Sequence, residues 1–486
     1  MSYVSIPYYI MVVLAVVLYY AVPKKIRWMV LLLASGCFYY AVSERKEQLV
    51  VFGISIVLSY YSGILLKRGR DRKYKNSTLK MILTAGIIAS GLPLLVSKCA
   101  EFFLGSVLHK PLIHWILPVG LSFYSLQTIG YLVDVYRAKM DPQKNIFRYT
   151  LFVSFFPLII QGPISRYDQL GKQLFEGHDY DSQRLMRGIQ LILWGWMLKY
   201  LIADKASVFV NAVFDHSAVY SGVFILVAAV LYSIQLYTDF LSCVTMSQGV
   251  AELFGIELTD NFNHPYFSTS INDFWKRWHK SLSAWLRDYI YIPLGGNRHG
   301  RVRKYVNLIL TFAVSGLWHG GRWKYLFWGL MHASYQILEE VLEQPVNGML
   351  EKISLPKGTR MRTLIEQMFN FFLVMLAWII FRAESLKAGI KMIGTMFGKF
   401  YPWVFFDNSL FQLGLSQKEF EVLFLAVALL LAVSVLQEKG IKIREWFHRQ
   451  NTAIRWMIYL CSIWSIWIFG TYGYGFQAAD FIYGGF

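Results

Sequence analysis

Apolar stretches close to the width of a bilayer recur along the whole chain. A transmembrane helix needs about 20 consecutive apolar residues. Soluble domains carry about 25% charged residues, whereas this chain of 486 residues carries 16%. Both observations predict an all-α polytopic membrane protein. The stretches cover residues 3–22, 28–42, 49–66, 81–97, 112–133, 186–202, 219–240, 304–318, 323–338, 364–382, 421–436 and 453–470.

The stretches predict about eleven transmembrane helices, together with shorter re-entrant or interfacial helices. We expect them to form one integral-membrane domain over residues 1–486. No secretory signal peptide precedes the first stretch, which is therefore predicted to remain as a span. The four cysteines show neither metal-ligand spacing nor a disulfide framework, so they are interpreted as small hydrophobic residues, and no metal site is predicted. They are Cys37, Cys99, Cys243 and Cys461.

The formal charge of +18 does not indicate a nucleic-acid partner, because the basic residues lie in short loops between apolar stretches. Such loops stay on the cytoplasmic side of a membrane. Residues 23–27 and 67–80 are both basic. Between them, the stretch 28–42 would cross the membrane outward and the stretch 49–66 would cross back. The N-terminus is therefore predicted to lie outside. The basic segment 442–450 precedes the last stretch, which places the C-terminus outside as well.

The least apolar region, about residues 256–303, divides the chain unevenly. Its centre reads "NDFWKRWHKSLSAWLRDYIYIPLGGNRHGR", in which aromatic and leucine side chains follow a helical period. We expect one helix there, capped by Ser270 or Asn272, at a bilayer interface or along a cavity lined by protein. The apolar face consists of Trp275, Trp278, Leu282, Trp285 and Tyr289, and a neighbouring stripe consists of Arg277, Lys280, Ala284 and Arg287.

A polar stripe runs through the apolar stretch that ends in "AVSGLWHGGRW". Its members are spaced by four residues, so they share one side of a helix. Polar groups at membrane depth normally face a protein interior or a water-filled cavity. The stripe consists of Asn307, Thr311, Ser315 and His319. His319 is therefore expected to face such a cavity at the end of a helix that Gly320 and Gly321 terminate.

A second membrane histidine, His332, follows thirteen residues after His319. The glycine pair between them predicts a helix break, so the two histidines are expected on different elements. For His332, a packing or interhelical hydrogen-bonding role has about equal weight with a functional one.

Imidazole suits a general base, because a partly desolvated histidine stays neutral and accepts a hydroxyl proton. No GxSxG nucleophile motif and no phosphate-binding glycine loop accompany these histidines. A base without a local nucleophile favours transfer of an activated group onto a hydroxyl that the substrate supplies.

Several sequence blocks resemble a known family. They are "LPVGLSFYSLQTIGYLVDVYR" (117–137), "FFPLIIQGPISRY" (155–167), "NFNHPYFSTSINDFWKRWHKSLSAWLRDYIYIPLGGNR" (261–298), "SGLWHGG" (315–321), "LAWIIFRAESL" (376–386) and the terminal "FIYGGF". Together they are similar to the membrane-bound O-acyltransferases, and in particular to the bacterial alginate-type polysaccharide O-acetyltransferases. Two places depart from the family pattern: "TDFLSC" (238–243), so no role is carried onto Asp239, and the glycines of the terminal block.

The resemblance implies a ring of helices around a central tunnel in the bacterial cytoplasmic membrane. It implies that an acyl group, in the first place acetyl, passes from a cytoplasmic thioester such as acetyl-CoA to hydroxyls of a polysaccharide outside. No cofactor would be bound. A secreted or membrane-anchored acetyltransferase would be the partner. The acceptor itself stays open among alginate, peptidoglycan, cellulose and other exopolysaccharides.

The family's invariant histidine corresponds to His319 and its second characteristic histidine to His279. Because a thioester is already activated, the enzyme has to position it, deprotonate the acceptor and stabilise an oxyanion. We assign the base to His319. His279 is expected to donate to the oxyanion or to orient the acyl group.

Other residues near the two histidines are assigned supporting roles. Trp278 and Trp318 are expected to wall the channel and exclude water. Arg277, Lys280 and Arg287 are candidates for attracting the donor's phosphates, with contact to lipid headgroups about equally weighted.

The terminal block adds a possible acyl relay. Relatives of the alginate type end in a similar tyrosine motif, and the resemblance implies that Tyr483 receives the acyl group near His319. A tyrosine hydroxyl is a poor nucleophile at its ordinary pKa near 10, so it would need a neighbouring base. The alternative for Tyr483 is an interfacial aromatic anchor.

Three other functions remain open from the sequence. A haem or metal protein would use His279 and His319 as ligands, although a partner ligand set is missing. A transporter would move a lipid-linked glycan through a central cavity that the segment "LPVGLSFYSLQTIG" lines. A teichoic-acid D-alanyl transferase would use the same acyl-transfer site, but the "PLGGNR" block favours the alginate type.

Overall fold

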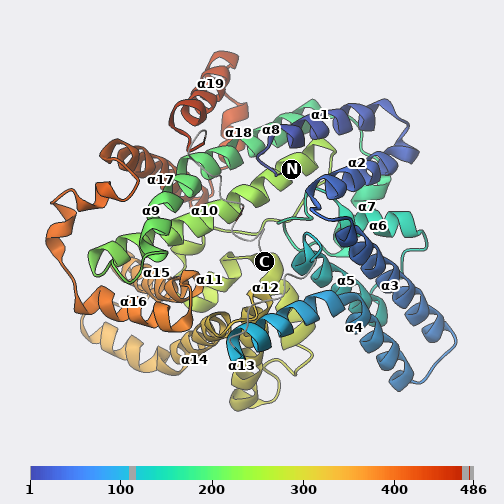
Figure 1. Cartoon of the computed structure of the whole chain (residues 1–486), viewed down its shortest axis with the longest axis horizontal. Coiled ribbons are helices and arrows are strands. Elements are labelled where there is room, and N and C mark those ends of the chain that lie inside the picture. The colour runs from blue at the N-terminus through green and yellow to red at the C-terminus, as the bar shows by residue number, and fades with distance from the viewer. Residues whose placement is uncertain (1, 109–116, 473–480, 482–486) are drawn as a thin grey trace.

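The computed structural model describes residues 2–108, 117–472 and 481. Its described part consists of helices joined by turns and loops (Figure 1). The N-terminal helices α1 to α3, drawn in blue, lie on one side of the molecule, and helices α14 to α17, coloured from yellow-tan through orange to red-brown, lie on the other (Figure 1). The long helix α10 (Val223–Leu253) runs between the two groups.

The N-terminal part contains long apolar helices and several shorter helices. They are α1 (Ile6–Ala21), the 3-10 helix η1 (Lys24–Ile26), α2 (Arg27–Val42), α3 (Lys46–Asp71), α4 (Asn76–Ala100), the π-helix η2 (Glu101–Val107), α5 (Leu121–Tyr136), α6 (Ile146–Ser154) and α7 (Tyr167–Glu176).

The remaining helices include the sequence blocks that contain His279 and His319. They are α8 (Ser182–Met197), the π-helix η3 (Leu198–Ala203), α9 (Asp204–Phe214), α10, the 3-10 helix η4 (Pro265–Phe267), α11 (Ile271–Arg277), α12 (Lys280–Leu286), the π-helix η5 (Arg287–Tyr291), α13 (Gly300–His319), α14 (Trp323–Lys352), α15 (Arg360–Arg382), α16 (Leu386–Gly398), the 3-10 helices η6 (Pro402–Phe405) and η7 (Ser409–Gln412), α17 (Gln417–Glu438), α18 (Ile443–His448) and α19 (Thr452–Phe469).

Several helices begin at side-chain caps. Free N–H groups in the first turn need acceptors, and short polar side chains supply them. Asn145 caps α6, Asp181 caps α8 and Asn451 caps α19. Ser416 and Glu419 form a reciprocal capping box at the start of α17. Local sequence therefore defines where these helices begin.

The prediction of an all-α membrane protein is confirmed. Among the described residues, seven helical segments are long and apolar enough to cross a bilayer, and α1 is a shorter apolar helix. Eleven spans were expected, and the number of spans stays a prediction. Helix α19 carries no buried residue although it is strongly apolar. Such a surface suits contact with lipid rather than with water.

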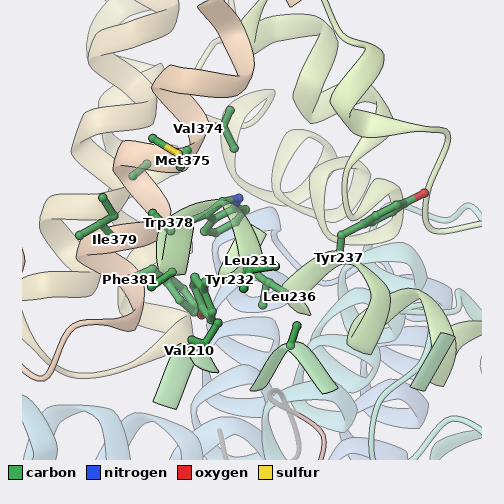
Figure 2. Packing of buried hydrophobic residues seen from close by; sticks show 14 of the residues in the cluster. Val210, Leu231, Tyr232, Leu236, Tyr237, Val374, Met375, Trp378, Ile379 and Phe381 are labelled. Atoms are coloured by element: carbon green, nitrogen blue, oxygen red, sulfur yellow. The ribbon is translucent and has the colours of Figure 1, made fainter. Parts of the chain in front are cut away.

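Helix α10 is the structural centre of the C-terminal half. It packs against α8, α9, η3 and α15, and most of its side chains are buried. Figure 2 shows Trp378 and Phe381 of α15 facing Leu231 and Tyr232 of α10. A second apolar core joins α1, α2, α3, α5 and α6. The histidine-bearing helices are positioned against these two cores.

The turn between α3 and α4 offers a direct test of topology. We expect a cysteine in place of the exposed Lys75 to resist an impermeant maleimide applied outside intact cells, because this basic turn should be cytoplasmic. Permeabilised cells should be labelled. Glu44→Cys, in the exposed turn between α2 and α3, is the matched control and should react from outside. Labelling of Lys75→Cys in intact cells would contradict this orientation.

Candidate functional site

The polar stripe of α13 lies in the protein interior, as predicted. Its four side chains are between 0% and 7% exposed. The Thr311 hydroxyl donates to the carbonyl of Asn307, and the Asn307 amide donates to the carbonyl of Gly296, 2.9 Å away. Each of these bonds satisfies a polar group away from water. The stripe therefore leads inward to His319 rather than to the surface.

Glycines hold α13 and α14 in close backbone contact near His319. A Cβ on Gly316 would lie 2.2 Å from the carbonyl oxygen of Tyr325, and one on Gly329 would lie 2.2 Å from that of Phe312. Only glycine permits this approach. Helix α13 ends at His319 and α14 begins at Trp323, so the break expected at the glycine pair is confirmed. His319 and His332 lie on different helices.

Aromatic rings enclose His319, which is 2% exposed. Its ring centroid lies 4.8 Å from that of Trp318, 5.1 Å from Trp328 and 5.4 Å from Phe381. The indole N–H of Trp318 donates to the carbonyl of Ser122 at 3.3 Å, which fixes that ring. This enclosure keeps bulk water from the imidazole, a condition that strengthens hydrogen bonding and charge interactions in a site.

His279 lies close to the same tryptophan. It is 1% exposed, and its ring centroid is 4.8 Å from Phe240 of α10 and 6.3 Å from Trp318. The indole of Trp318 therefore contacts both imidazoles, which come from sequence positions 40 residues apart. The structure brings the two predicted catalytic histidines into one buried aromatic region.

The backbone of His279 is left-handed, with φ 43° and ψ 54°. This conformation is rare for a residue with a Cβ and costs on the order of 1–3 kcal/mol, so it persists only where surrounding contacts impose it. The single helix expected over Trp275 to Tyr289 is therefore wrong. The chain forms α11, breaks at Trp278 and His279, and continues as α12 and η5. The break turns the imidazole toward Trp318. The Ser270 cap is confirmed.

The two predicted wall tryptophans have different surroundings. Trp318 belongs to a small apolar cluster with Phe123 of α5 and with Leu282 and Trp285 of α12, and it lies between the histidines. Trp278 packs in the main core, with ring centroids 5.1 Å from Trp378 and 5.5 Å from Phe274.

The three basic candidates also differ in their contacts. Arg277 pairs with Asp273 at 3.0 Å and with Glu438 at the end of α17. The side chain of Arg287 is 62% exposed and pairs with Asp288 at 2.8 Å. Lys280 donates its backbone N–H to the carbonyl of Asn261. Although burial raises the pKa of Asp288, hydrogen bonds from Arg287 and Arg166 hold that pKa below its ordinary value.

His332 has the packing role that was one of its two interpretations. It is fully buried, and its Nδ1 accepts the indole N–H of Trp275 at 3.3 Å. Its ring also packs against Trp328 and Phe274. Among the described residues, no group of three or more His, Cys, Asp or Glu side chains is arranged to hold a metal ion.

A buried ionic cluster was missed in the sequence. The Lys199 ammonium lies 2.8 Å from Asp239 Oδ1 and 2.9 Å from Asp204 Oδ1, and all three side chains are at most 3% exposed. The same ammonium lies 4.5 Å from the ring centroid of Phe481. Charges inside apolar segments are costly and usually functional, so a lysine within the stretch 186–202 was the available signal. Tyr483 lies outside the described residues.

The fold and the two buried histidines define a multi-pass membrane protein with an imidazole-bearing interior. A family model described as "MBOAT, membrane-bound O-acyltransferase family" matches residues 141–383, which include both histidines. The chain belongs to the membrane-bound O-acyltransferase family, and it is an O-acyltransferase.

Curated relatives agree with this membership. A probable alginate O-acetylase of Azotobacter vinelandii is 34% identical over 434 residues, covering 87% of this chain and 82% of the relative. A peptidoglycan O-acetyltransferase of Helicobacter pylori is 31% identical over 76% of this chain and 73% of the relative. A teichoic acid D-alanyltransferase of Bacillus subtilis is 29% identical over 56% of this chain and 71% of the relative.

Proposed function

We propose that this enzyme transfers an acetyl group from a cytoplasmic thioester, such as acetyl-CoA, to hydroxyls of a polysaccharide outside the bacterial cytoplasmic membrane. The observation that carries the proposal is the burial of His279 and His319 on either side of Trp318. The printed activities of the alginate and peptidoglycan relatives support acetyl as the group and polysaccharide as the acceptor. D-alanyl transfer is the second candidate, supported at lower identity.

His319 serves as the general base in this reaction. It takes the proton of the hydroxyl that attacks the thioester carbonyl, which belongs to Tyr483 in a relay and to the polysaccharide in a direct transfer, so a C–O bond forms and the C–S bond breaks. The imidazolium then returns the proton to the departing thiolate, and the products are an O-acetyl ester and a free thiol. His279 is the second catalytic histidine, and Trp318 keeps water from the reacting atoms.

The donor's phosphates are expected at the basic side chains of the 277–287 segment. The exposure of Arg287 makes it the most accessible of the three candidates, and Lys280 directly follows His279. Arg277 already has two carboxylate partners. It would therefore attract the donor's phosphates through the local electrostatic potential rather than by direct contact with them. An Arg287→Gln variant that needs a higher donor concentration would support this placement.

The C-terminal segment is expected to reach the same interior. Phe481 is 4% exposed, and its ring packs against Tyr3 and over the Lys199 ammonium. Lys199 is paired to Asp239, whose neighbour Phe240 contacts His279. A buried Phe481 supports a route by which Tyr483, two residues later, accepts an acyl group and passes it to a secreted or membrane-anchored acetyltransferase partner.

Tyr483→Phe tests this relay, because it keeps the ring and removes only the hydroxyl. We expect O-acetylation of the extracellular acceptor to fall at least about tenfold, since this hydroxyl would be the nucleophile that takes the acyl group from the thioester and the leaving group when the next acceptor attacks. Tyr472→Phe is the matched control: that hydroxyl donates to the carbonyl of Trp467 at the end of α19. Normal acetylation by Tyr483→Phe would make Tyr483 an interfacial anchor.

The proposed function is tested in membrane vesicles that contain the enzyme, its acceptor polysaccharide and a thioester labelled in the acetyl group. We expect label in alkali-labile esters of the polysaccharide and release of free thiol. Movement of unlabelled glycan without ester formation would instead indicate a transporter. Incorporation from a D-alanyl thioester, but not from the acetyl thioester, would favour the second candidate.

A further inference from the structure

Asn261, in the loop between α10 and η4, is buried beside His279 and is 1% exposed. Its side-chain oxygen Oδ1 accepts the backbone N–H of Ser281 at 3.0 Å and the hydroxyl of Ser281 at 2.9 Å. Its backbone carbonyl accepts the N–H of Lys280 at 2.9 Å. One asparagine thus accepts the backbone N–H groups of the first two residues of α12, directly after the left-handed His279.

These bonds settle which way the Asn261 amide points. The oxygen and nitrogen of an asparagine side chain are distinguished by their hydrogen-bond partners. A backbone N–H can only donate, so the atom that faces Ser281 N has to be the acceptor, the oxygen. The orientation of the amide therefore follows from a donor whose identity is fixed.

The same oxygen lies 3.3 Å from Nδ1 of His279. An amide oxygen cannot donate, so a hydrogen bond between these atoms requires the hydrogen on Nδ1. A neutral imidazole carries one N–H, which leaves a lone pair on Nε2. Nε2 is buried, and it has no hydrogen-bond partner among the described residues. Of those residues, Asn261 is the one that hydrogen-bonds the imidazole; Phe240 and Trp318 offer ring contacts.

We propose that Asn261 is a positioning residue that holds His279 in the Nδ1–H tautomer, so that Nε2 accepts a hydrogen bond from a hydroxyl of the bound substrate. This inference rests on the proposed acyl transfer and specifies the part of His279 in it. While neutral, this tautomer has no hydrogen on Nε2 with which to donate to an oxyanion. The substrate class it recognises is one that presents O–H groups, as a polysaccharide acceptor does.

Asn261→Ala removes the tautomer-setting oxygen. We expect the rate of acyl transfer at saturating donor to fall by a factor of about 10 to 100, the usual cost of losing a group that orients a reactive histidine. Asn261→Asp keeps an oxygen in place and should lose less. Asn263→Ala is the matched control, because the side chain of Asn263 is exposed and its hydrogen bonds to Arg277 are made by the Asn263 backbone. It should behave as wild type.

Methylated histidines separate tautomer control from a structural role. A histidine methylated on Nδ1, placed at position 279 in the Asn261→Ala background, keeps its lone pair on Nε2 without help from residue 261. The shorter alanine leaves space for the methyl group. We expect acyl transfer by this protein to be at least about tenfold faster than by Asn261→Ala with an ordinary histidine. Methylation on Nε2 should give no such increase.

Three results would overturn the inference: a wild-type rate in Asn261→Ala, recovery with the Nε2-methylated histidine, or no recovery with either. Membrane insertion of each variant is checked by fluorescence-detected size exclusion of a tagged chain. If the wild-type enzyme itself fails to form esters in the same vesicles, the proposed function fails, and this failure is distinct from a failure of the Asn261 assignment.

Discussion

Replacing His319 with alanine is expected to lower acyl transfer by a factor of about 10² to 10⁴, the usual contribution of a positioned general base. The imidazole is enclosed by Trp318, Trp328 and Phe381, so water has little access to replace it as a proton acceptor. The measurement is the initial rate of labelled ester formation in vesicles, normalised to the amount of inserted enzyme.

A second buried histidine provides the matched control for that experiment. His332 lies in the same aromatic region and accepts the indole N–H of Trp275. In His332→Gln the amide oxygen can still accept this bond, so near-normal activity is expected. If His319→Ala retained the wild-type rate, or if His332→Gln were equally impaired, the assignment of His319 as the base would have to be abandoned.

The sequence predicted the long helices and the helix break between the two membrane histidines for simple reasons. Apolar length and four-residue polar spacing are each properties of one segment; the candidate spans among the described residues show the first, and α13 shows the second. Gly320 and Gly321 directly follow the end of α13, and a glycine pair in an apolar segment is a local signal, whereas the close approach of α13 and α14 at Gly316 and Gly329 was not predicted. Structural features that depend on one segment alone, such as the long helices and the helix end at a glycine pair, were therefore predictable.

The break at His279 was not predictable from local pattern. The apolar spacing from Trp275 to Tyr289 continues across the left-handed residue, so the periodicity predicts one continuous helix. At the break the chain is bonded by Asn261, which is 18 residues earlier in the chain and accepts the backbone N–H of Ser281 in the first turn of α12. A tertiary contact overrides helix propensity here. The Lys199 cluster was missed for a similar reason, because its carboxylates come from α9 and α10.

Two substitutions at His279 should separate its imidazole from its backbone. His279→Ala is expected to lower acyl transfer about tenfold to a hundredfold, less than His319→Ala, because it removes one hydrogen-bonding group of the reaction rather than the base. Alanine also fits a left-handed backbone poorly, so this variant alone leaves two explanations. His279→Asn resolves them, since asparagine tolerates φ near the observed 43°.

The asparagine variant should therefore insert and fold as well as wild type and still lose activity about as severely as the alanine variant. The loss would then come from the missing imidazole and not from a rearranged junction between α11 and α12. The melting temperature of the purified protein and the rate of ester formation report the two effects separately. If His279→Asn kept the wild-type rate, His279 would serve only to shape the backbone, and the pairing of two catalytic histidines across Trp318 would be wrong.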